Sequence, residues 1–330
     1  MVKYHQNKNQ TNQTNEKVKK IQRKRLLFKR KKIFKIKKIS NNNKFTINSK
    51  VEWNKYYDID KKIFLEYGSS IFSDLNEVQQ TYSLISAEKI LRHNITPKNR
   101  YLLIRYTIEL LKVLPNNENT FFQIIYLFDK FLEKTKKILD DNSSKIYFCV
   151  CFELAMKMES SVIFDLESNI TSLFCIEPKQ FENLLDIEIE ILETIEFEIN
   201  CPINLLDYYQ ISIYDFNLNV PKEFYWNKVN ENLLYQINFS TVLISKFLTI
   251  EPLIFYNYKD NELNAATIIF ASSMACTMVK NYDKNLINFF NCWMNNFIVN
   301  SKLDIKLVNK IYNLIYTFYD ENIRKNNYKY

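Results

Sequence analysis

The 330-residue chain contains a single glycine, Gly68, and only two histidines, His5 and His93. Tight hairpin turns, phosphate-binding loops and nucleophile elbows need glycine at positive φ, so its scarcity argues against sheet-rich folds and nucleotide-binding enzymes. Two histidines are too few to make a histidine-containing catalytic triad or a histidine-ligated metal site a good candidate. The composition therefore favours helices joined by polar turns.

The cysteines do not have the spacing of a metal site. They lie at 149, 151, 175, 201, 276 and 292, with no C-x-x-C pair and no nearby histidine. We interpret them as reduced core residues and expect neither a metal nor a cofactor. The chain also lacks a secretory apolar segment and any run of 18 apolar residues, which predicts a soluble intracellular protein that does not bind a membrane.

Charge is distributed unevenly along the chain, whose net charge is +8. Residues 1–48 contain 16 Lys/Arg and one acidic residue, Glu16, whereas residues 49–330 contain 29 basic and 36 acidic residues. The chain thus joins a basic tail of +15 to a body of −7, and a basic partner surface suits the body. An acidic body is not expected to bind nucleic acid directly.

We interpret the tail as a nuclear-import signal, with a merely solubilising tail as the alternative, and expect the protein in nucleus and cytoplasm. Its import run comprises Lys19, Lys20, Arg23, Lys24, Arg25, Lys29, Arg30, Lys31 and Lys32. The expected partner of this run is an import receptor. Arg23 and Leu26 fit an R-x-x-L destruction motif that a ubiquitin ligase would read, although basic stretches near leucines produce this pattern by chance.

Helical periodicity dominates the rest of the chain. It predicts helices at 62–82, 97–114, 118–134, 143–159 and 178–197, and then at 204–214, 222–248, 260–280, 284–299 and 303–325. The predicted fold is all-α, with a basic, largely disordered tail at 1–60, an N-terminal helix and five-helix domain within 61–202, and a second five-helix domain at 203–330.

The two helical series resemble each other at a shift of 116 residues. This shift aligns Lys130-Phe131-Leu132 with Lys246-Phe247-Leu248, and Ala155 with Ala271. One helix in each series is apolar all round and rich in Cys, Ala and Thr. Such a helix is typical of a buried centre that its neighbours approach closely.

Four ionisable residues interrupt apolar stripes: Arg100, Asp129, Lys157 and Glu188. A buried charge is costly unless it is paired, so each needs a partner. For Arg100 and Asp129 we favour an internal ion pair. For Lys157 and Glu188 two readings stay open, an internal pair or contacts with the backbone of another protein.

These residues also lie in segments that resemble the cyclin box. Arg100-Tyr-Leu-Leu-Ile is similar to its R-x-x-L opening, Tyr126-Leu-Phe-Asp129-Lys-Phe131-Leu132 to its Y-L-D-R-F-L segment, and Met156-Lys157-Met-Glu159 to its S-K-x-E-E segment. The C-terminal end of the box is matched by a set of spaced residues in this chain: Glu188, Ile191, Leu192, Ile195, Phe197, Ile199 and Pro202. Upstream, Glu66-Tyr67, Ile71, Leu75, Glu77 and Tyr82 resemble the extra N-terminal helix of A- and B-type cyclins.

The resemblance implies roles for these residues. Lys157 and Glu188 would contact the regulatory helix of a cyclin-dependent protein kinase, with Ile146 and Glu159 in the same interface. Arg100 and Asp129 would be a structural brace. It also implies two tandem cyclin-fold domains, well matched in the first half and weakly in the second.

A docking groove for R-x-L motifs of substrates is a further candidate site. It would comprise Leu102, Leu103, Tyr106, Glu109 and Lys145. Arg105, Tyr106, Asn99 and Lys145 depart from the usual residues of the family, whereas Glu109 keeps the acid that holds the docked arginine. An ordinary amphipathic surface helix is the alternative.

The implied function is that of a cyclin that binds and activates a cyclin-dependent Ser/Thr kinase in cell-cycle, and specifically mitotic, control, without being an enzyme. A transcription-linked cyclin and an adaptor resembling transcription factor IIB are the alternatives. The latter normally begins with a zinc ribbon, and no cysteine precedes Cys149. A helical enzyme is disfavoured because no acid–base or nucleophile set converges.

Overall fold

A computed structural model describes residues 73–79, 85–112, 118–159, 183–201 and 203–324. The chain divides into two compact units, residues 1–60 and 61–330, and the first unit lies outside the described residues, as does the predicted import run. Residues 73–79 are helical, as predicted, while the rest of the predicted 62–82 helix lies outside the described ranges.

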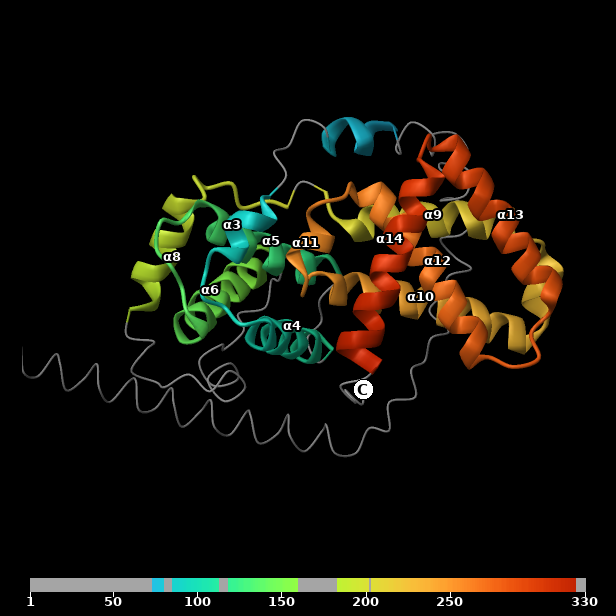
Figure 1. The fold of residues 1–330 in the computed structure, drawn as a ribbon, viewed down its shortest axis with the longest axis horizontal. Helices are drawn as coiled ribbons and strands as arrows, with labels where there is room; N and C mark the ends of the chain where they lie inside the picture. The colour runs from blue at the N-terminus through green and yellow to red at the C-terminus, as the bar shows by residue number, and fades with distance from the viewer. Residues whose placement is uncertain (1–72, 80–84, 113–117, 160–182, 202, 325–330) are drawn as a thin grey trace, which may run out of the picture. The chain divides into compact units, whose positions relative to one another are not determined.

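The described residues of the second unit form two successive sets of helices (Figure 1). The first set contains α3 (Ala87–Leu91), α4 (Pro97–Leu111), α5 (Glu118–Lys134), α6 (Asp141–Glu159) and α8 (Leu184–Thr194). The second contains α9 (Leu205–Asn219), η2 (Lys222–Trp226), α10 (Lys228–Leu248), α11 (Pro252–Phe255), α12 (Asp260–Met278), α13 (Lys284–Asn300), α14 (Ile305–Phe318) and the π-helical η3 (Tyr319–Arg324). Apart from one isolated bridge between Asn94 and Asp140, these residues contain no β-structure, so the all-α prediction is confirmed.

Side-chain caps explain where several helices begin. Thr96 caps α4 by accepting a hydrogen bond from the Asn99 amide, and Pro97 occupies the first turn, as the sequence predicted. The range 222–248, predicted as one helix, is instead split at Asn227. The side chain of Asn227 accepts from the Val229 amide, and this cap starts α10 after the short η2 turn.

One central helix in each set is buried, as the small-residue pattern predicted. In α6 the closely packed positions are Cys149, Val150, Cys151 and Ala155, and in α12 they are Ala265, Ala266, Ala271 and Ala275, all at most 2% exposed. α6 packs against α4, α5 and α8, while α12 packs against α9, α10 and α14. Small side chains thus let neighbouring helices approach both centres.

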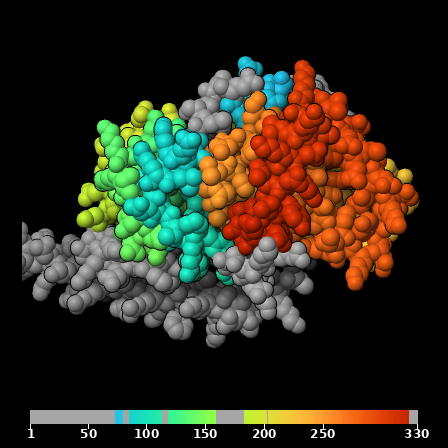
Figure 2. All heavy atoms as spheres, viewed as in Figure 1, coloured from blue at the N-terminus to red at the C-terminus, as the bar shows by residue number. Residues whose placement is uncertain are grey.

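Two short helices that periodicity did not predict are α3 and α11. α11 packs against α3 of the first set and against α10 and α14 of the second. Figure 2 shows the side chains of the first set (cyan and green) and of the second (orange and red) in contact along this line. A four-residue helix such as α11 is too short to show helical periodicity.

Two helices end in the same hydrogen-bonded motif without glycine. After α8, the amide of Glu196 donates to the Glu193 carbonyl and that of Phe197 to the Leu192 carbonyl, with φ of 57° and 59° at the two donors. After α13, Lys302 takes the position of Glu196, donating to the Val299 carbonyl at φ 54°, and Leu303 takes that of Phe197, donating to the Ile298 carbonyl. Glycine usually occupies this left-handed position, so these ends cost conformational energy.

Candidate partner-binding surface and its internal brace

Arg100, in the first turns of α4, forms an ion pair with Asp129 of α5. Nη1 and Nη2 of Arg100 each donate a 2.7 Å hydrogen bond to one oxygen of the carboxylate. The two side chains are 8% and 0% exposed. Burial disfavours the charged guanidinium, but the charge of Asp129 outweighs this and raises the pKa of Arg100.

The same pair reaches into the second helix set. Arg100 Nε and Nη2 donate to the carbonyl oxygen of Thr249 at 3.0 and 2.7 Å, and the Tyr256 hydroxyl donates to Asp129 Oδ2 at 2.7 Å. Burial, followed by the charge of Asp129, raises the pKa of Tyr256, so this hydroxyl keeps its proton. We call these four residues the interdomain brace.

Two buried lysines were not found by sequence reasoning. Lys130 and Lys246, aligned by the 116-residue shift, have side chains only 4% and 10% exposed. Lys130 pairs with Glu198 at 2.9 Å, and Lys246 pairs with Glu118 at the start of α5. The repeat itself was the signal, because it placed a lysine at the same core-facing position twice.

Apolar packing and peripheral ion pairs together hold α8 against the first set. Of its own residues only Ile191 is buried, with Ile195 buried at its cap. Around them, glutamates of α8 and the following turn pair with lysines of α5 and the α5–α6 loop: Glu190 with Lys137 at 2.5 Å, Glu196 with Lys134 at 3.4 Å and Glu198 with Lys130 at 2.9 Å. The hydrogen bond from Lys130 lowers the pKa of Glu198, so that carboxylate stays charged.

Lys157, near the end of α6, pairs with Glu188 of α8 at 2.6 Å and with Glu153 at 3.4 Å. The Lys157 side chain is 50% exposed and that of Glu188 is 20% exposed. Burial opposes the charge on Lys157, but Glu188 and Glu153 outweigh it and raise the pKa of the lysine. Lys157 is therefore exposed and does not lie on a core face as expected, whereas Glu188 is half-buried on the face of α8 that carries the buried Ile191.

Exposed apolar side chains adjoin this pair in the sequence. On α8, Leu185 and Ile189 are 68% and 45% exposed, and on α6 Met158 is 37% exposed. Beyond α8, Phe197 is 66% exposed on left-handed backbone. Exposed apolar residues on the two helices that carry a paired lysine and glutamate, and just beyond them, are a feature of protein-binding surfaces. We call Met158, Leu185, Ile189 and Phe197, with Lys157 and Glu188, the α6–α8 surface.

The remaining candidate interface and groove residues have varied surroundings. Ile146 is half-buried against the core, and Glu159 is the last residue of α6, with its side chain outside the described set. In the candidate groove, Leu102, Tyr106 and Lys145 are half-buried, and Glu109 is 54% exposed and 3.6 Å from Lys112. Leu103 is only 1% exposed. It therefore supports α4 from the core and would not touch a docked peptide.

The described titratable groups offer no nucleophile or metal set. Burial raises the pKa of the Cys149, Cys151 and Cys201 thiols, which keeps them protonated near neutral pH. The ring of His93 hydrogen-bonds the Leu132 carbonyl and the Leu139 amide. Among the described residues no three His, Cys, Asp or Glu side chains could hold a metal ion, and no described helix has the length and apolarity to span a bilayer.

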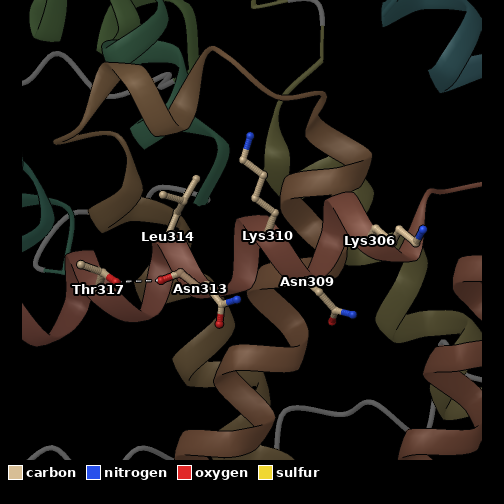
Figure 3. A pocket seen from close by; sticks show the side chains of 6 residues that line it. All are labelled: Lys306, Asn309, Lys310, Asn313, Leu314 and Thr317. Carbon is tan, nitrogen blue, oxygen red and sulfur yellow. Dashed lines mark hydrogen bonds between the residues drawn. The ribbon is translucent and has the colours of Figure 1, made fainter.

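A shallow hollow of about 520 Å³ lies along α14. It is lined by Lys306, Asn309, Lys310, Asn313, Leu314 and Thr317. In Figure 3 the side chain of Lys310 points away from those of Asn309 and Asn313, and Lys306 extends along the helix. These polar groups do not converge on one point, so the hollow lacks the arrangement of a small-molecule site.

Comparison with known proteins finds a match for the segment that contains Arg100 and Asp129 of the brace and the α6–α8 surface. The family model described as "Cyclin, N-terminal domain" matches residues 70–200. The match contains Arg100, Asp129, Lys157 and Glu188, and it supports the cyclin family for this chain.

The solved structure of a viral cyclin from herpesvirus saimiri is also similar, at 16% identity and a TM-score of 0.48. The similarity covers 76% of this chain and all of the viral cyclin chain. No curated protein matches the sequence. The cyclin match therefore rests on residues 70–200.

Proposed function

We propose that this protein is a cyclin that binds a cyclin-dependent Ser/Thr kinase and activates it. The observation that carries the proposal is the α6–α8 surface inside the segment that matches the cyclin N-terminal domain. There, Lys157 and Glu188 are accessible to a partner and have exposed apolar neighbours. On this proposal both residues bind the main chain of the kinase's regulatory helix.

The activity would be conformational rather than catalytic. A regulator docked on the movable helix of a kinase brings the ATP-site lysine and glutamate together and frees the activation loop, so the phosphoryl-transfer chemistry belongs to the kinase. Paired as they are, Lys157 and Glu188 are preorganised at the surface. Backbone carbonyl and amide groups of the kinase can form further hydrogen bonds with the paired side chains, because the ammonium has three donors and the carboxylate has several acceptor sites.

We assign the protein to mitotic control as an A- or B-type cyclin. The support is the resemblance of the segment upstream of Pro97 to the extra helix of those types, together with the helical conformation of residues 73–79. The basic tail supports a nuclear as well as a cytoplasmic location, because its net charge of +15 suits an import receptor.

The test is to mix the purified full-length chain with individual cyclin-dependent kinases and measure phosphorylation of a histone substrate. The chain alone should transfer no phosphate, and a cognate kinase should bind it and gain activity. Phosphate transfer by the isolated chain would overturn the proposal. Failure to bind or stimulate any kinase of a complete panel would overturn it equally.

A further inference from the structure

Helix 73–79 is attached to the second helix set by amide and hydroxyl side chains. Gln79 Nε2 donates to Asp260 Oδ2 at 2.9 Å, and Asn261 Nδ2 donates to Asn76 Oδ1 at 2.9 Å. The hydroxyl of Tyr208 lies 3.2 Å from both Asn76 Oδ1 and Gln79 Oε1. Residues more than 120 positions apart are thus joined by a small polar cluster.

Two carboxyl groups lie at or near this cluster, and no cation pairs with either among the described residues. Asp260 is the first residue of α12 and half-buried, and Asp207 lies in the first turn of α9, where its Oδ2 accepts from the Asn204 amide. Neither forms an ion pair with a described residue. Two carboxylates in one half-buried site disfavour each other's charge, so the cheaper state has one of them protonated.

Among the described residues, the groups around Asp260 do not supply the missing positive charge. The titratable and charged residues around Asp260 are Asp207 and Tyr208 of α9, Cys201 before α9, Lys259 and Glu262 at the start of α12, and Asp74 and Glu77 of helix 73–79. The lysine is exposed, and Asp74 and Glu77 are exposed acids. Burial, followed by the charge of Asp207, raises the pKa of Asp260 to about 7, against a smaller lowering by the Gln79 hydrogen bond.

We propose that the contact between helix 73–79 and the start of α12 is a proton-operated latch, which closes fully only when Asp260 carries a proton. A neutral carboxyl can both donate to and accept from the Gln79 amide, and it relieves the repulsion with Asp207. This device does not depend on the proposed kinase partner.

The direction of the effect follows from the two states of Asp260. In the open state its carboxyl meets water and has an ordinary pKa near 4, whereas in the closed state its pKa is about 7. A raised pKa in the closed state stabilises that state at low pH, and the stabilisation is lost as pH rises through 7. Because one proton is involved, the open population should rise roughly tenfold between pH 6 and pH 8.

Hydrogen–deuterium exchange of residues 73–79 in the full-length protein measures this opening. After correction for intrinsic exchange, protection should fall roughly tenfold from pH 6 to pH 8. Asp260→Asn, which imitates the neutral carboxyl, should keep its protection across this range, and Asp207→Asn should move the midpoint to lower pH. Asp304→Asn, at the exposed cap of α14, is the matched control and should behave as the unaltered protein.

Two results would overturn the latch. One is protection of residues 73–79 in the unaltered protein that does not change between pH 6 and pH 8. The other is an unchanged pH profile in folded Asp260→Asn. If that variant does not fold, the profiles of the unaltered protein and of Asp207→Asn decide the matter.

Discussion

Arg100 and Asp129 meet through two parallel 2.7 Å hydrogen bonds inside the protein, and the carboxylate has no exposed surface. The guanidinium also binds the Thr249 carbonyl of the other helix set. The pair therefore satisfies the charge of Asp129 and joins the two sets. Such geometry makes the loss of one partner far more costly than the loss of a surface ion pair.

Arg100→Ala should lower the free energy of unfolding by about 3–5 kcal/mol, because it leaves a buried carboxylate without its cation. Chemical denaturation of the full-length protein measures this change. The control is Lys112→Ala, which breaks an exposed pair with Glu109 and should cost less than about 1 kcal/mol. Equal, small effects of the two substitutions would show that the brace does not stabilise the fold.

Lys157→Ala and Glu188→Ala should change the free energy of unfolding by only about 0–1 kcal/mol, because both side chains reach solvent and neither charge is left fully buried. Each should nevertheless weaken kinase binding roughly tenfold or more, since a charge-assisted hydrogen bond contributes about 1.5–3 kcal/mol. Lys89→Ala, another exposed lysine paired with a glutamate, should leave binding unchanged. Unaltered kinase affinity in both folded variants would remove these residues from the interface.

Phe197→Gly should separate stability from binding. Glycine adopts the left-handed backbone at this position without strain, so the free energy of unfolding should stay the same or rise by about 1 kcal/mol. Kinase affinity should fall about tenfold, because an exposed aromatic anchor is lost. Lys302→Gly, at the same kind of helix end after α13, should raise stability alike and leave binding intact. A Phe197→Gly variant with full affinity would contradict the assignment of Phe197 to the α6–α8 surface.

His93 should make the protein less stable in mild acid. Burial lowers its pKa, so the folded protein holds the neutral ring, whose nitrogens bond the Leu132 carbonyl and the Leu139 amide. The stability from a depressed pKa is present above the unfolded value of about 6.5 and is lost as pH falls below it. Denaturation curves between pH 5 and pH 7.5 should show a decline at the acid end that His93→Gln reduces. The same decline in both proteins would assign it to other groups.

Deletion of residues 1–48 should reduce nuclear accumulation and leave kinase binding unchanged, because the deleted segment carries the +15 and precedes, in the sequence, every residue assigned to the kinase interface. Fluorescence imaging of tagged full-length and shortened chains, with a kinase pull-down from the same cells, measures both. An unchanged distribution between nucleus and cytoplasm would favour the alternative, that the tail only increases solubility.

Much of the fold follows from helical periodicity. The predicted range 118–134 coincides with α5, and the predictions for α6, α12 and α13 agree within about two residues at each end. α3 and α11 were missed because helices of five and four residues are too short to show a period. The break at Asn227 depends on a cap, which competes locally with helix continuation.

The site was harder to read from the sequence than the fold. In α8, apolar residues lie on both faces: Ile191 is buried, whereas Leu185 and Ile189 are exposed. The pattern of an 11-residue helix correctly placed Glu188 on the face of the buried Ile191, but it could not show that Lys157 on the neighbouring helix is half exposed. The pairing of Arg100 with Asp129 could be anticipated from the cost of buried charge, but its contact with Thr249 required the packing of two helix sets.

The interdomain brace also bears on the order of folding. Arg100 and Thr249 are 149 residues apart in the sequence, so their contact closes a long loop, whereas each helix forms from near neighbours. A contact of such long range is expected to form after the rate-limiting step. Weakening it would then leave the folding rate nearly unchanged and accelerate unfolding, so the brace sets how long each folded molecule survives before it opens.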